Sequence, residues 1–208
     1  MHYRLTCINS SNMHGNFVLY QRPERCEGSA HIRSLAWLSR PAAPGTRVTF
    51  SWRDSTSFVW GERVLGGNGG HFVISQSITA DIDRDNLVDL KGDSFSAPTF
   101  CNLRSTPGAE GLTIRQLNAH FEYPLYHGIA RGGAALMIAP FHVNVSTTFV
   151  VDAAAYWLHF NDCRAGEVLD YGQLDGSLRL DFGPARHSHS VMMGPDNIIR
   201  PTPDPHWH

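Results

Sequence analysis

"TFSWRDSTSFVWGE" (49–62) decides the fold class, because aromatic and polar residues alternate on both sides of a polar centre. One aromatic pair, Phe50 and Trp52, precedes the polar residues RDSTS, and a second pair, Phe58 and Trp60, follows them. Side chains at i and i+2 share one face of a β-strand, so each pair lies on a single face. The stretch therefore predicts two half-buried strands joined by a polar turn as a hairpin, with the four aromatic side chains packed inward.

The same alternation recurs along most of the chain, and glycine- and proline-containing turns separate the runs at short intervals. We therefore expect an all-β fold, an antiparallel two-sheet β-sandwich of roughly ten strands. We expect a single domain over 1–208, in which the proline-rich residues 200–208 form an extended C-terminal tail. The runs with the pattern are 3–8, 16–21, 47–52, 71–80, 111–117, 141–151, 156–160 and 177–182.

Composition narrows the classes of function. The 208 residues are 42% hydrophobic and 17% charged, and the formal net charge is −2. A nucleic-acid-binding protein usually carries a basic patch, so no nucleic-acid partner is expected. No apolar run reaches the roughly 18 residues that a membrane helix needs, so no membrane span is expected. The first residues also lack the pattern of a signal peptide, which predicts a soluble cytoplasmic protein and leaves open export by another route.

Twelve histidines raise the question of a metal site. In the sequence "HSH", His187 and His189 lie at strand spacing, so both side chains could ligate one copper or zinc ion. The C-terminal "HWH" gives His206 and His208 the same spacing, and His2 could join them if the two termini meet. The alternative is that these are ordinary solvent-exposed histidines, and the primary expectation is that the protein needs no cofactor.

Aromatic residues outside the inward faces are the other candidates for binding. Trp157 shares a strand face with His159, and Trp207 lies in the tail. We predict these three residues as ligand-binding positions, because exposed rings often contact sugars or other flat ligands. The sequence has no nucleophile motif such as G-x-S-x-G, so no catalytic residue is predicted.

Four segments of the chain are similar to the RhiA-like (rhizosphere-expressed) family of soil and plant-associated bacteria. The segment "SLAWLSRPAAPGTRVTFSWRDSTSFVWGE" is the most specific of them. The resemblance implies a soluble bacterial protein whose expression is linked to quorum sensing and plant association, and it brings no catalytic motif. The segments are 5–21, 34–62, 156–170 and 194–197.

Three functions therefore stay open. The first, which we favour, is a non-enzymatic binding or interaction protein whose ligand or protein partner the sequence does not identify. The second is a metalloprotein that holds copper or zinc through His187, His189 and another histidine. The third is a structural or storage protein that assembles as a homo-oligomer through exposed strand edges.

Overall fold

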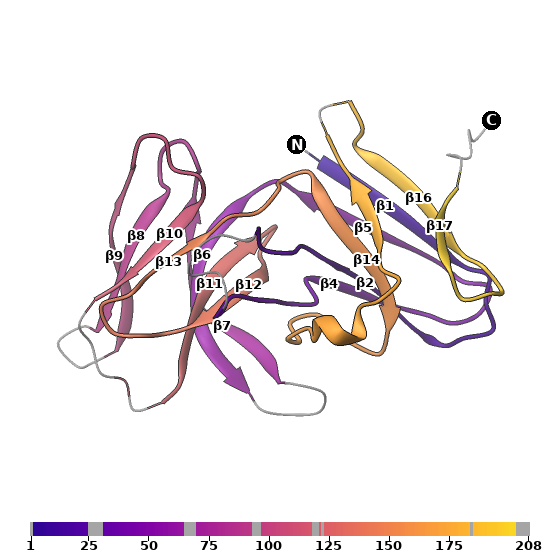
Figure 1. The fold of residues 1–208 in the computed structure, drawn as a ribbon, viewed down its shortest axis with the longest axis horizontal. Coiled ribbons are helices and arrows are strands. Elements are labelled where there is room, and N and C mark those ends of the chain that lie inside the picture. The colour runs from indigo at the N-terminus through magenta and orange to yellow at the C-terminus, as the bar shows by residue number, and fades with distance from the viewer. Residues whose placement is uncertain are drawn as a thin grey trace.

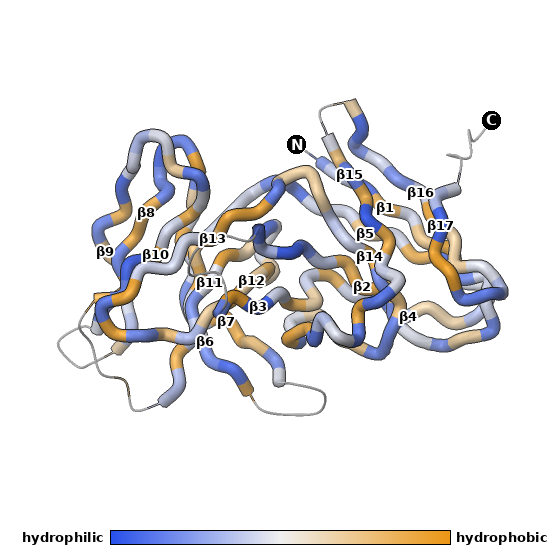
Figure 2. The backbone as a smooth tube through the Cα atoms, in the orientation of Figure 1, coloured by the Kyte–Doolittle hydropathy of each residue, from blue (hydrophilic) through white to orange (hydrophobic). Residues whose placement is uncertain are grey.

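In the computed structural model the chain folds almost entirely into β-strands, which form four sheets (Figure 1). Two sheets lie together on the right of Figure 1 and two on the left. Hydrophobic and hydrophilic residues alternate along many of the strands (Figure 2). The structure describes residues 2–24, 31–64, 70–92, 97–117, 121, 123–183 and 185–202.

The two sheets on the right contain both ends of the described chain. Their strands are β1 (His2–Asn9), β2 (Gly15–Tyr20), β4 (Leu38–Ala42), β5 (Arg47–Arg53), β14 (Ala155–Asn161), β15 (Leu178–Asp181), β16 (Ser188–Met193) and β17 (Ile199–Pro201). The first, here called the β1 sheet, has the order β17-β16-β1-β5, and the β14 sheet has the order β15-β14-β2-β4. A short 3₁₀ helix, η2 (Tyr171–Gln173), lies between β14 and β15 in the chain.

The two sheets on the left are formed by the middle of the chain and by one short early strand. Their strands are β3 (Arg33–Ser34), β6 (Thr56–Val64), β7 (His71–Ala80), β8 (Leu87–Gly92), β9 (Pro98–Arg104), β10 (Leu112–Gln116), β11 (Leu125–Arg131), β12 (Ala134–Pro140) and β13 (Ser146–Phe149). The β11 sheet has the order β3-β12-β11-β6-β7, and the β8 sheet has the order β13-β10-β8-β9.

The all-β prediction is confirmed, but the predicted antiparallel two-sheet sandwich of roughly ten strands is not confirmed. The part of the chain that the structure describes has seventeen strands in four sheets. β1 pairs with β16 in parallel, and β8 pairs with β10 in parallel. The alternation within a strand shows that one face is buried, but it carries no information on which strand lies beside it or in which direction.

The predicted hairpin at 49–62 is also wrong, although its aromatic side chains do pack inward. β5 pairs with β1, whereas β6 pairs with β7 and β11, so the chain crosses between two sheets at this point. Phe50, Trp52 and Phe58 are buried. Trp60 is half-buried and donates a hydrogen bond from Nε1 to Oε1 of Gln76 at 2.6 Å.

A second crossing runs through the segment "SLAWLS" (34–39), between β3 and β4. Trp37 lies at its centre with 1% of its surface exposed, and its Nε1 donates to the carbonyl oxygen of Arg131 at 2.9 Å. Its ring lies 5.4 Å from that of Trp52 and 5.6 Å from that of Tyr156, between ring centroids. Trp37 therefore contacts side chains of the β1 and β14 sheets and the backbone of the β11 sheet, within one core cluster.

The segment 162–170 forms backbone hydrogen bonds with the same crossing. Gly166 donates its N–H to the carbonyl oxygen of Ala36 at 2.8 Å, and Ala36 donates to that of Glu167 at 2.8 Å. Phe72, at the start of β7, donates to the carbonyl oxygen of Gly166 at 3.0 Å. The segments 34–39 and 162–170, which belong to two of the four segments that carry the resemblance, thus hold the left and right pairs of sheets together.

The β8 sheet carries a buried carboxylate on the face away from the core. Asp89 is fully buried and accepts hydrogen bonds from Arg115 Nε and Nη2, each at 2.8 Å, and from Arg104 Nη2 at 3.0 Å. Asn102 Nδ2 donates to it at 2.9 Å. Burial alone would raise the pKa of Asp89, but these hydrogen bonds outweigh it and hold the pKa well below its usual range.

We expect Asp89→Asn to lower the free energy of unfolding at pH 7 by about 2 kcal/mol, because two guanidinium groups lose their ionised acceptor. The folded-state pKa lies below the unfolded value, so the stabilisation is present above about pH 4 and is lost as the pH falls further. Urea unfolding at pH 7 and pH 3 measures both effects. A difference between parent and variant that stays the same at both pH values would contradict this account.

Candidate functional site

Of the two "HSH" histidines, only His189 lies on the inner face of the β1 sheet. His189 is 6% exposed, and its ring lies 4.5 Å from that of Phe182. Its Nε2 lies 2.9 Å from the carbonyl oxygen of Asp181. Because a carbonyl oxygen only accepts, Nε2 carries the hydrogen and is not free for a metal. His187 lies outside β16, is exposed, and has its ring 5.8 Å from that of Tyr3.

His2 lies on the opposite face of the same sheet. The parallel register places Leu5 beside His189, and Leu5 is buried. His2 alternates with Tyr3 and Leu5 and is exposed, so it points away from both histidines of "HSH". Within the described ranges, no group of three or more His, Cys, Asp or Glu side chains could hold a metal ion. His206, Trp207 and His208 lie outside the described residues.

Trp157 and His159 lie on the outer face of the β14 sheet, which is partly covered by the segment 162–177. The Trp157 ring is half-buried between two guanidinium groups, with the Cζ atoms of Arg22 and Arg179 at 5.1 and 5.5 Å. His159 Nδ1 lies 3.2 Å from Oγ of Ser177, and burial lowers the pKa of His159. The predicted binding pair is therefore largely occupied by contacts within the chain.

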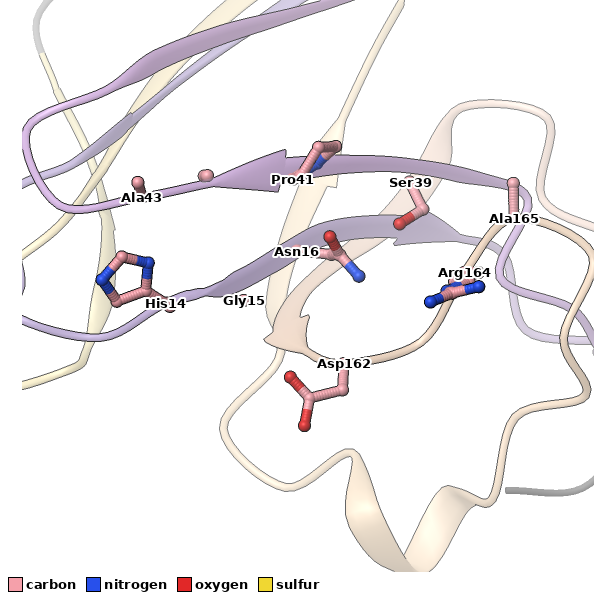
Figure 3. Close-up of a pocket in the computed structure, with 10 residues that line it drawn as sticks. His14, Gly15, Asn16, Ser39, Pro41, Ala43, Asp162, Arg164 and Ala165 are labelled. Atoms are coloured by element: carbon pink, nitrogen blue, oxygen red, sulfur yellow. The ribbon is translucent and has the colours of Figure 1, made fainter. Parts of the chain in front are cut away.

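A groove of about 760 Å³ opens farther along that face (Figure 3). Figure 3 shows Asp162 and Arg164 on one side of it and His14 and Asn16 on the other. Asn16 Nδ2 donates to the carbonyl oxygen of Cys163 at 3.0 Å, and Oγ of Ser39 donates to the same oxygen at 2.9 Å. These two polar side chains anchor the loop that forms the wall, and the charged ones are exposed to solvent.

A second cavity, of about 510 Å³, lies where the chain crosses between the left and right pairs of sheets. The crossing from β5 to β6 and the crossing from β13 to β14 both line it, together with the ends of β7 and β11 and the start of β10. Its lining residues are Asp54, Ser55, Thr56, Thr79, Ala80, Asp81, Ile82, Glu110, Gly111, Leu112, Ile129, Arg131, Phe149, Val151 and Ala153.

Arg131 is the buried charged residue of this cavity, with 5% of its side chain exposed. Its Nη1 donates to the hydroxyl of Tyr156 at 2.6 Å and to the carbonyl oxygen of Ala153 at 3.2 Å. Its Nε lies 3.6 Å from Oδ1 of Asp54, an ion pair too long for a hydrogen bond. Nε is therefore a buried donor without a hydrogen-bond acceptor.

The hydroxyl of Tyr156 also accepts a hydrogen bond from Trp52 Nε1 at 3.3 Å. Burial raises the pKa of Tyr156 and of its neighbour Tyr3. Both phenols therefore stay neutral at physiological pH, and Asp54 supplies the compensating negative charge for Arg131. The network positions the guanidinium rigidly in the wall of the cavity.

The rest of the lining combines an apolar floor with polar groups at the rim. Leu112, Ile129 and Phe149 are buried, whereas Asp81 and Glu110 are exposed and make no ion pair with any residue that the structure describes. Neither histidine nor cysteine, the side chains that most often act as base or nucleophile, is among the described lining residues. The lining combines one buried cation with exposed carboxylates, hydroxyl groups and an apolar floor.

No pattern in the sequence indicated this cavity. Asp54 lies in what reads as a polar turn, and Arg131 precedes the turn glycines Gly132 and Gly133. The antiparallel pairing of β6 with β11 places Arg131 beside Thr56, and this pairing joins segments far apart in the chain. The only available signal was a strongly polar residue at the end of a hydrophobic strand, which is also typical of an ordinary hairpin.

Comparison with known proteins found one relationship. A protein-family model with the description RhiA matches residues 1–200. No curated protein and no solved structure matches the chain. Within its described part the chain has no helix long and apolar enough to cross a membrane.

Proposed function

The chain belongs to the RhiA family, and from this premise we propose that it is a binding protein that holds a small ligand in the cavity around Arg131. The observation that carries the proposal is a cavity of about 510 Å³ in which a buried cation, Arg131, held by Tyr156 and Asp54, lies beside an apolar floor.

The size and composition of the cavity support the proposal. Ligand sites commonly have volumes of about 300–1,000 Å³, apolar walls and a few convergent polar groups, and they often lie between packed units of a protein. The cavity has each of these features, and two chain crossings form it. The groove of Figure 3 is larger, but its charged side chains are solvated and two of its polar side chains already bind the loop.

The other two functions from the sequence have weaker support. Copper or zinc binding stays a prediction that needs ligands beyond His187 and His189, since His2 points away from them. Assembly through strand edges stays a prediction as well. The link to quorum sensing and plant association is implied by the family resemblance alone. No feature of the cavity argues for or against it.

Blocking the mouth of the cavity tests the proposal. We expect Thr79→Trp to abolish binding of small fragments (amines, acids, alcohols and amides) that the parent protein binds, because Thr79 lies exposed at the lining. Ser77→Trp is the matched control, since Ser77 is also exposed on β7 but does not line the cavity. Ligand-detected NMR measures the binding of each fragment.

Two outcomes would overturn the proposal. One is that the parent protein binds no fragment at millimolar concentration. The other is that every bound fragment still binds Thr79→Trp, which would place the binding elsewhere, for example in the groove of Figure 3.

A further inference from the structure

A further hollow, of about 320 Å³, lies beside the β11 sheet where β11 begins and β12 ends. Tyr126 pairs with Pro140 there, and Phe141 donates its N–H to the carbonyl oxygen of Leu125 at 2.9 Å, so the two segments that form the walls are fixed side by side. We call this hollow the aromatic groove. Most of the described side chains that line it are aromatic or proline, namely Phe121, Tyr123, Pro124, Tyr126, Pro140 and Phe141.

The aromatic groove presents apolar side chains to solvent on a rigid floor. Tyr123 is 41% exposed, and Val143, which also lines the groove, is 46% exposed. The rings of Phe121 and Phe141 lie 4.9 Å apart, edge to face, and both pack against the main core. Exposed apolar side chains that gather in one place on a folded protein mark an interaction surface. The groove therefore suits an apolar occupant.

The chemistry of this lining matches a segment of the chain itself. Grooves lined by aromatic rings bind proline-rich segments in the polyproline II conformation, because the stiff proline rings pack against the aromatic rings at a low cost in entropy. The C-terminal tail, "RPTPDPHWH" (200–208), has a proline at every second position from Pro201 to Pro205. A polyproline II helix has three residues per turn, so Pro203 and Pro205 lie on two of its three edges and both can contact one groove.

The tail starts in the other half of the fold. β17 is the outermost strand of the β1 sheet, and Thr202 donates its N–H to the carbonyl oxygen of Ser190 at 2.8 Å. Figure 1 shows β17 at the right and β11 and β12 in the left half. Pro203 and Pro205 follow Thr202 by one and three residues, which limits their reach to roughly 10 Å. They therefore stay near the β1 sheet of their own chain, and the groove that they can enter belongs to another copy.

We propose that the aromatic groove of one copy of the chain binds the proline-rich tail of a second copy, with Pro203 and Pro205 packed against its aromatic rings. Because the groove and the tail are different surfaces, each copy can bind one neighbour through its groove and another through its tail. The copies therefore assemble head to tail, into rings or open chains, as the concentration rises. The contact is small, so the association is weak and reversible.

Analytical ultracentrifugation of the full chain from about 10 μM to about 1 mM tests the proposal. The average mass of the parent protein should rise with concentration. Tyr123→Ser removes an aromatic ring from the groove and should weaken self-association about tenfold. Leu103→Ser is the matched control, because Leu103 is also 41% exposed, lies on β9 and is not among the described residues that line the groove. It should change nothing.

A second variant tests the tail. The double variant Pro203→Ala/Pro205→Ala removes both proline rings and their stiffness, and it should weaken self-association at least about tenfold. Pro107→Ala, at an exposed proline in the turn between β9 and β10, is its control and should change nothing.

Mixing the two variants tests the head-to-tail geometry. Tyr123→Ser keeps an intact tail, and Pro203→Ala/Pro205→Ala keeps an intact groove. At a concentration at which each variant alone is monomeric, an equimolar mixture should form dimers and nothing larger, because it can make one intact contact between each pair of different copies.

Three results would overturn this inference. The first is a parent protein that stays monomeric up to about 1 mM. The second is self-association that Tyr123→Ser weakens no more than Leu103→Ser does, which would place the contact on another surface, such as a strand edge. The third is an equimolar mixture that contains no dimer. The proposed function does not depend on any of them, because the groove and the Arg131 cavity share no described lining residue.

Discussion

Replacing Trp37 by Ala is expected to lower the free energy of unfolding by about 4 kcal/mol. The side chain is 1% exposed and packs against Trp52 and Tyr156, so its removal leaves a large cavity in the core. The substitution also removes the hydrogen bond from Nε1 to the carbonyl oxygen of Arg131. Because Trp37 lies at the crossing from β3 to β4, the loss weakens the junction of the left and right pairs of sheets.

Chemical denaturation of three variants tests this expectation. Trp37→Phe should cost about 1–2 kcal/mol, since it keeps an aromatic ring but loses the hydrogen bond. Trp157→Ala is the control, because Trp157 is half-buried on an outer face and its removal should cost much less than that of Trp37. Equal losses for Trp37→Ala and Trp157→Ala would contradict a structural role at the crossing.

Acidification is expected to destabilise the protein through His127. The side chain is fully buried in β11, neither ring nitrogen has a hydrogen-bond partner, and the ring lies 5.9 Å from that of Phe149. Burial, with a smaller contribution from the charge of His142, lowers the pKa of His127 to about 3. The unfolded chain has a histidine pKa of about 6.5.

Between these two values the unfolded state binds a proton that the folded state does not. Stability therefore falls as the pH drops below about 6.5, by about 1.4 kcal/mol per pH unit from this residue, or roughly 3 kcal/mol by pH 4. His127→Leu should remove this part of the slope, because leucine suits the apolar surroundings and does not titrate. Urea unfolding at pH 7, 5.5 and 4 measures the slope for parent and variant.

The variant His142→Gln shows whether burial or repulsion by the charge of His142 is the main cause of the lowered pKa of His127. His142 is exposed, so this variant should keep most of the slope if burial is the main cause. If the free energy of unfolding depends on pH equally in the parent and in His127→Leu, the account is wrong. The His127 side chain would then gain a hydrogen-bond partner or a route to water when it is protonated, contrary to the geometry described above.

The strands that could be predicted are those in which the alternation of apolar and polar residues in the sequence matches the alternation of buried and exposed side chains in the structure. In β1, Tyr3, Leu5 and Cys7 are buried and their neighbours are not, as the pattern indicates. The alternation in 141–151 was misleading. Asn144 has φ 60° in a turn and Val143 and Val145 are exposed, so the strand begins only at Ser146. Alternation fits a strand, but it does not prevent a locally favoured asparagine turn.

The cavity could not be predicted, for a different reason. The ion pair of Asp54 with Arg131 depends on the pairing of β6 with β11, and the ring contacts of Trp37 depend on a crossing between sheets. Each contact joins segments that are distant in the chain, and no residue spacing encodes it. The predicted residues Trp157 and His159 do share one face, as expected, but that face is partly covered by the chain itself.

A crystal structure of the protein soaked with the small fragment that it binds most tightly tests the central claim most directly. The account predicts the fragment in the cavity at the two crossings, beside Arg131 and the apolar floor of Leu112, Ile129 and Phe149. A cavity filled only with water at a saturating concentration of the fragment, or a fragment bound solely in the groove of Figure 3, would contradict it.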